Sequence, residues 1–149
     1  MSKKYASYSM MCMSAGYIYV VIELIYRQRS DVSMMLVASI CAVPIIFINN
    51  WFTFEIDYLV QILSCSTICT FIELIAGLAV NADHSIWDYS EIPFNYKGQI
   101  CLPFFLVWIV ICAIFIVVMD WVEYNVFDDG EVPYYKIFGR EIFRLRGRS

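Results

Sequence analysis

Four long apolar segments, separated by short polar ones, constrain this chain more than any other feature of its sequence. A helix needs about 20 mostly apolar residues to cross the hydrocarbon core of a bilayer. The second segment is the shortest and contains Pro44, so we expect it to be kinked or to cross only partly. The pattern predicts an all-α, polytopic helical bundle over residues 1–125, with a longer loop at 81–99. The four expected transmembrane helices cover residues 8–26, 34–48, 58–80 and 100–119.

The composition supports a membrane protein and excludes other classes. Of the 149 residues, 61% are hydrophobic and 16% are charged, whereas an average soluble domain has about 45–50% and about 25%. A soluble fold of this size has too much surface to hide so many apolar side chains. The net charge of −4 has the wrong sign for a surface that follows nucleic-acid phosphates. We therefore expect the lipid bilayer as a partner, and no nucleic acid.

The distribution of lysine and arginine predicts the orientation. Four spans place both termini on one side of the membrane, and cytoplasmic loops and termini carry an excess of positive charge. Seven basic residues fall on the side of the termini and three on the other, so both termini are predicted to be cytoplasmic. The seven are Lys3, Lys4, Lys136, Arg140, Arg144, Arg146 and Arg148, and the three are Arg27, Arg29 and Lys97.

The tail, residues 126–149, carries a regular basic pattern. Lys136, Arg140, Arg144 and Arg148 recur every four residues, and apolar side chains fall between them. This spacing predicts an amphipathic helix that lies on an anionic membrane surface. Two other interpretations are a solvated charged tail and a helix that docks on a partner protein.

Two glutamates lie within the predicted spans. Glu73 is flanked by apolar residues inside the third span, and Glu23 lies toward the end of the first. A charge near the bilayer centre costs at least about 2.5–3.5 kcal/mol, and such residues usually serve ions, protons or substrates. The structural interpretation is a protonated glutamate that only holds neighbouring helices together.

The surroundings of these glutamates are similar to each other. Residues 21–26 read Val-Ile-Glu-Leu-Ile-Tyr and residues 71–76 read Phe-Ile-Glu-Leu-Ile-Ala. The similarity indicates a tandem repeat of a two-helix hairpin, with Glu23 and Glu73 at similar depth. Ordinary coincidence in an apolar chain is the alternative.

The loop at 81–99 holds the most distinctive residues of the chain. It lies on the same side as Glu23 and Glu73 and contains Trp87, Asp88, Tyr89 and Asn95. We expect these six residues to form a substrate or ion pathway, with the loop as a re-entrant or lid segment covered by protein or water. The simpler interpretation is an aromatic belt at the membrane interface followed by a turn.

Motifs of several enzyme classes are absent from the sequence. It lacks the Gly-x4-Gly-Lys-Ser/Thr loop of ATPases and the motifs of zinc proteases and serine hydrolases. Cys65 and Cys69 share a helical face without further ligands at metal-binding spacing, which favours packing. A membrane enzyme with Asp88 or Glu91 as acid or base would lack a visible nucleophile–base pair. We therefore expect no enzyme activity, no cofactor and no metal.

The loop motif resembles a known family. Trp87-Asp88-Tyr89-Ser90, Pro93-Phe94-Asn95, Gly98 and Ile100-Cys101-Leu102 are similar to the signature of small bacterial membrane proteins called ABC-transporter permeases, type IV, CmpB-like. Gly16, Glu23 and Tyr26-Arg27 resemble that family's first helix, and Glu73 resembles its glutamate before the loop block. The chain departs from the pattern at Tyr17, where tryptophan is usual, and from Gln28 to Pro44.

The resemblance implies a permease role in a bacterial inner membrane. The sequence therefore predicts a transporter or permease subunit that moves a small solute or ion by means of its intramembrane glutamates. A separate ATPase chain or a homo-oligomer is the expected partner. The alternative is a regulatory, assembly or sensor subunit that does not transport.

Overall fold

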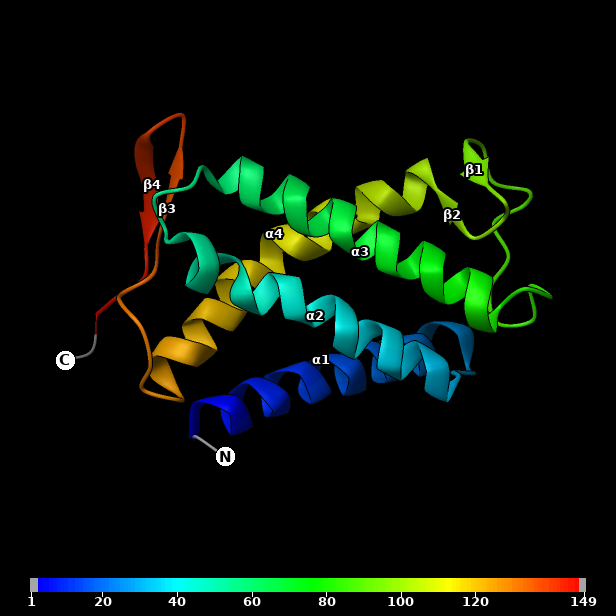
Figure 1. Ribbon diagram of the computed structural model, residues 1–149, viewed down its shortest axis with the longest axis horizontal. Coiled ribbons are helices and arrows are strands. Elements are labelled where there is room, and N and C mark those ends of the chain that lie inside the picture. The colour runs from blue at the N-terminus through cyan, green and yellow to red at the C-terminus, as the bar shows by residue number, and fades with distance from the viewer. Residues whose placement is uncertain (1–2, 148–149) are drawn as a thin grey trace.

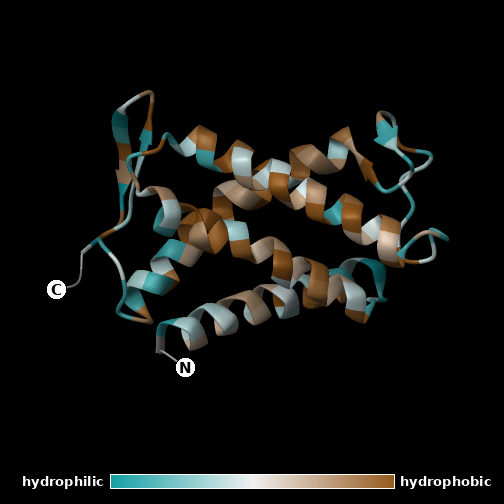
Figure 2. Cartoon of the chain, viewed as in Figure 1, coloured by the Kyte–Doolittle hydropathy of each residue, from teal (hydrophilic) through white to brown (hydrophobic). Residues whose placement is uncertain are grey.

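A computed structural model describes residues 3–147 and has four long helices as its main elements (Figure 1). Each helix is long and apolar enough to cross a membrane, and apolar residues gather on the helices while polar ones lie mainly at the two ends (Figure 2). The expected all-α membrane bundle is confirmed. The helices are α1 (Lys3–Arg27), α2 (Val32–Phe52), α3 (Tyr58–Val80) and α4 (Leu102–Asn125).

The helices alternate in direction, so the two ends of the chain lie at the same end of the bundle (Figure 1). An aspartate caps the start of α2 and of α3, where the chain reverses direction. Asp31 accepts a hydrogen bond from the Ser33 backbone N–H at the start of α2, and Asp57 accepts one from the Leu59 N–H at the start of α3. Helix α1 packs on α2, and α3 packs on both α2 and α4. Loop 81–99 therefore covers the end of the bundle opposite to the termini.

Gly16 sets the distance between α1 and α2. A Cβ atom at this position would lie 2.7 Å from the Met35 carbonyl oxygen and 2.2 Å from the Ser39 hydroxyl oxygen. Only glycine allows the two backbones to come this close, as is common between membrane helices.

The second span is longer than the sequence indicates. Helix α2 is continuous through Pro44 and extends beyond residues 34–48 to Val32 and Phe52. Half of its most apolar stretch is buried, a larger share than in the other three helices, because α2 packs against α1, α3 and α4. The helix begins after the Asp31 cap and ends at Thr53, whose φ is positive, and at 21 residues it is long enough to cross a membrane.

The tail forms a β-hairpin, so the prediction of an amphipathic helix is wrong. Strand β3 (Tyr134–Ile137) pairs antiparallel with β4 (Arg140–Arg144). The turn contains Phe138 and Gly139, both with positive φ, a conformation that ends any helix. Tyr135 is 1% exposed and anchors the hairpin against the bundle. Pairing of the two strands therefore replaces the helix that the four-residue spacing predicts.

The basic residues of the tail do not share one face. Lys136 forms an ion pair with Glu55 at 2.6 Å, and Arg144 pairs with Glu141 at 2.6 Å, while Arg140 is exposed. Arg148 lies outside the described residues. Contact of this hairpin with a membrane surface stays a prediction.

Candidate functional site

Glu73 is the best-defined polar group inside the bundle. It lies on α3 and is 5% exposed, on a face that also buries Ser66 and Gly77. The Tyr89 hydroxyl donates a hydrogen bond to Glu73 Oε1 at 3.1 Å, and the Trp108 indole N–H donates one to Oε2 at 3.0 Å. The structure thus brings Tyr89 and Glu73 together, and both hydrogen-bond donors to the carboxyl group are neutral.

A cavity of about 100 Å³ borders this carboxyl group. Tyr19 from α1, Tyr89 from the loop and Trp108 from α4 line it together with apolar residues of α2 and α4. Burial, together with the neighbouring Glu73 carboxylate, raises the pKa of Tyr89, so its phenol remains a proton donor at neutral pH. The ring of Tyr89 stacks on Phe104 with 4.4 Å between centroids, which fixes the direction of the donated hydrogen bond.

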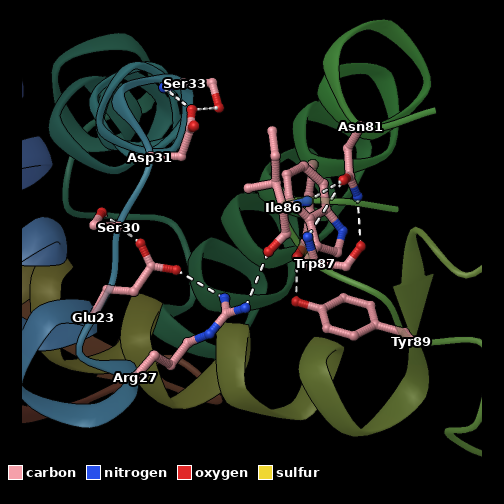
Figure 3. A network of polar contacts seen from close by, with 10 residues as sticks. Glu23, Arg27, Ser30, Asp31, Ser33, Asn81, Ile86, Trp87 and Tyr89 are labelled. Atoms are coloured by element: carbon pink, nitrogen blue, oxygen red, sulfur yellow. Dashed lines mark hydrogen bonds and ion pairs between the residues drawn. The ribbon is translucent and has the colours of Figure 1, made fainter. Parts of the chain in front are cut away.

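Glu23 has a different kind of environment. It is 6% exposed, and Arg27 forms an ion pair with it at 2.9 Å while the Ser30 hydroxyl donates to it at 2.6 Å. A second nitrogen of Arg27 donates to the Ile86 carbonyl oxygen at 3.0 Å, so the arginine links α1 to the loop (Figure 3). Tyr19 of α1 interacts electrostatically with both Glu23 and Glu73, so it lies near both carboxyl groups.

The loop is fixed by a closed set of hydrogen bonds at its base. Asn81 Nδ2 donates to the Trp87 carbonyl oxygen at 2.6 Å and to Gln99 Oε1 at 3.0 Å. Gln99 Nε2 donates to the Asn81 carbonyl oxygen at 2.9 Å, and the Trp87 indole N–H donates to the Gln99 carbonyl oxygen at 3.0 Å. Trp87 is 3% exposed. Its role in the structure is to hold the loop as a fixed cap.

The side chains of Asp88 and Asn95 form hydrogen bonds within the loop and not with the two glutamates, and their place in a pathway stays a prediction. Asp88 is exposed and accepts a hydrogen bond from the Ser90 backbone N–H at 2.9 Å. Asn95 is also exposed, and its Nδ2 donates to the carbonyl oxygens of Ser90 and Ile92. Both side chains stabilise turns within the loop, a use typical of Asx residues.

Sequence reasoning missed several members of the site. Trp108 gives the carboxyl group a donor from α4, and Tyr19 lines the cavity from α1. The position of Arg27, four residues after Glu23, suits a helical ion pair, which the sequence analysis does not use. Asn81 and Gln99 could have been found as amides that flank an aromatic loop.

A protein-family model matches most of the chain. The model is described as "Putative ABC-transporter type IV" and covers residues 5–138, which include all four helices and the loop. Comparisons with curated proteins and with solved structures gave no match.

Proposed function

We propose, from the premise that this chain belongs to the type IV ABC-transporter family, that it is a membrane subunit through which a small solute or ion passes beside Glu73. Membership of the family and the four apolar helices make it a multi-pass membrane protein of the ABC-transporter class. What we propose beyond this is the route of the solute or ion through the bundle and the part that the glutamates play in it.

The observation that carries the proposal is a buried carboxyl group beside an open space. Glu73 is 5% exposed, has neutral donors, and borders a cavity of about 100 Å³. A carboxyl group that only joins helices needs no adjacent cavity, whereas one that exchanges a proton or meets a cation does. Tyr89 and Trp108 would orient the carboxyl group without neutralising it.

The Arg27 link suggests how access is controlled. Arg27 binds Glu23 on its own helix and the Ile86 carbonyl oxygen of the loop. A solute that displaced this arginine would release the loop edge and open the way past Tyr19 toward Glu73. The second cavity, about 160 Å³ and lined by Glu23, Arg27, Arg29 and Ser30 among others, lies at this contact. It would be the outer vestibule.

The proposal places the chain in a bacterial inner membrane with both termini in the cytoplasm. Its sequence has no phosphate-binding loop, so ATP would be hydrolysed by a separate chain. The end of the bundle that carries the termini would face that ATPase, and the loop would face the opposite side.

The test compares Glu73→Gln with wild type in the complex isolated from its native membrane. Gln keeps the size and the acceptor oxygen but removes the acidic proton. The complex is placed in vesicles that contain a pH-sensitive dye, and the internal signal is followed after ATP is added. We expect Glu73→Gln to assemble normally and to lose the ATP-dependent signal, whereas Glu91→Gln, an exposed loop variant, keeps it.

The alternative, a regulatory, assembly or sensor subunit, rests on a separate observation. The loop is held by Asn81, Trp87 and Gln99, and the cavity at Glu73 is small. If Glu73→Gln and wild type give the same signal, proton movement beside Glu73 is ruled out and the accessory role is favoured.

A further inference from the structure

The other end of the bundle, where the termini lie, contains a larger cavity. Its volume is about 420 Å³, within the about 300–1,000 Å³ that is usual for small-molecule sites. The ends of α2 and α4 and the segment that leads to β3 form its walls. Five carboxyl groups line it, together with Asn49, Asn50, Thr53, Phe54, Gly130, Pro133 and Tyr134. The five are Glu55, Asp120, Glu123, Asp129 and Glu131.

Among the described residues, the two inner carboxyl groups, Asp120 and Glu123, have only neutral hydrogen-bond partners. Asp120 is 4% exposed, and Asn49 and Tyr135 both donate to its Oδ2, at 2.8 and 2.7 Å. Glu123 is 6% exposed and accepts hydrogen bonds from Tyr8 and Asn50, at 2.8 and 3.0 Å. Two donors converge on one oxygen of Asp120, so its Oδ1 is left for another donor.

The two lysines nearby bind the outer carboxyl groups instead. Lys4 pairs with Asp129 at 2.9 Å, and Lys136 pairs with Glu55 at 2.6 Å. Among the described residues, the inner pair, Asp120 and Glu123, therefore forms no ion pair with a basic side chain. Burying carboxyl groups without a compensating charge is costly, and a bound cation would remove that cost.

An independent observation points to a missing donor at the same place. Asn49 lines the cavity and is 8% exposed, and its Oδ1 is buried with no hydrogen-bond partner among the described residues. The Nδ2 of the same amide donates a hydrogen bond to Asp120. A buried carbonyl oxygen without a donor is uncommon and calls for a ligand or a water molecule.

The shape of the site favours an organic cation over a metal ion. No group of three metal-ligating side chains suited to a metal ion occurs among residues 3–147. The carboxyl groups are spread around the cavity, and the ring of Phe54 lines it, while the Tyr134 ring already carries Lys136 and Arg144 of the same chain. Aromatic faces attract ammonium groups, and Thr53, Gly130 and Glu131 at the rim are exposed, which gives access.

We propose that this cavity binds an organic cation with two or more ammonium groups, a diamine or polyamine. One ammonium group donates to Asp120 Oδ1, Asn49 Oδ1 and Glu123, and a second reaches Glu131 at the rim. This site does not depend on the pathway beside Glu73, because the two cavities share no lining residue.

The experiment is a titration of the purified full chain in detergent, by calorimetry and thermal unfolding. The probe is 1,4-diaminobutane, its uncharged counterpart 1,4-butanediol is the matched control, and ionic strength is held constant with NaCl. We expect saturable binding and a raised melting temperature with the diamine only. Failure of the diamine to bind, or binding of MgCl2 with equal heat and equal stabilisation, would overturn the proposal.

Variants locate the site. Glu123→Gln is expected to weaken diamine binding about tenfold, or about 1.4 kcal/mol, and the exposed Glu131→Gln about threefold, that is about 0.65 kcal/mol. Glu91→Gln at the opposite end should bind as wild type. If Glu123→Gln does not fold, the diamine affinity of Glu131→Gln still tests the site, because the Glu131 side chain is exposed and is not part of a helix. Unchanged affinity in Glu131→Gln and in a folded Glu123→Gln would contradict the assignment.

Discussion

The indole N–H of Trp108 on α4 donates a hydrogen bond to Glu73 Oε2 on α3, with 3.0 Å between nitrogen and oxygen. This contact joins two spanning helices at the buried carboxyl group, beside the loop that caps the bundle. Glu73 also receives the Tyr89 hydroxyl from that loop. One carboxyl group therefore connects two helices and the cap.

Replacement of Trp108 by Phe tests this connection. The ring remains, but the donor to a buried carboxyl group is lost, which costs about 1–3 kcal/mol for a buried acceptor. Thermal unfolding in detergent should show the variant to be less stable than wild type. Trp121→Phe is the matched control, because Trp121 is on the same helix and 47% exposed. Equal effects of the two variants would mean that the Glu73 contact contributes nothing specific.

Gly77→Ala should loosen the loop. A Cβ atom at this position would lie 2.3 Å from Gln99 Oε1, and Gln99 is 2% exposed and bonded to Asn81. Overpacking of this kind costs about 1–3 kcal/mol. Faster proteolysis within residues 81–99 is the expected readout. Gly147→Ala, where the nearest atom is 3.8 Å away, should leave cleavage unchanged, and an equally resistant loop in Gly77→Ala would refute the prediction.

Arg27→Gln should separate α1 from the loop. The arginine binds both Glu23 and the Ile86 carbonyl oxygen, and glutamine is too short and uncharged to do both. Because the pair is partly exposed, we expect a stability loss of no more than about 1 kcal/mol. Hydrogen exchange at residues 83–88 should quicken in Arg27→Gln and stay unchanged in Arg29→Gln. A Glu23→Gln, Arg27→Gln double variant whose effects simply add would argue against the ion pair.

The attachment of the hairpin should weaken in acid. A hydrogen bond from Lys136, followed by one from Tyr134, lowers the pKa of Glu55 below its ordinary value of 4.5. A lowered pKa in the folded state stabilises the fold above pH 4.5, and this stabilisation is lost as pH falls through the lowered pKa. Hydrogen exchange of the β3 amides should therefore quicken, relative to a distant segment, below pH 4.5. Glu55→Gln should show no such pH dependence; a wild-type profile without this acid limb would contradict the account.

The helices could be predicted from the sequence because a bilayer imposes length and hydropathy on every span. The third segment agrees with the structure at both ends, Tyr58 and Val80. The tail could not be predicted in this way, because a basic residue at every fourth position fits both a helix and a strand that turns. The positive φ at Phe138 and the burial of Tyr135 depend on contacts with the bundle, which no local pattern contains.

The candidate site was predictable only in part. Glu73 stands out because a carboxyl group in an apolar helix is costly, and Tyr89 lies in the loop that follows. The contact with Trp108 depends on how α3 and α4 pack, and the sequence does not specify that register. Asp88 and Asn95 share the loop with Tyr89, but turn geometry directs them into hydrogen bonds within the loop.

The most direct test of the account is mass spectrometry of the tagged protein, gently extracted from its native membrane. A membrane subunit of an ABC transporter without a phosphate-binding loop of its own needs an ATPase partner. The account predicts a stoichiometric ATPase in the extracted complex, retained in Glu73→Gln because that variant keeps its size and shape. Recovery of the chain alone, or with a partner that is not an ATPase, would contradict it.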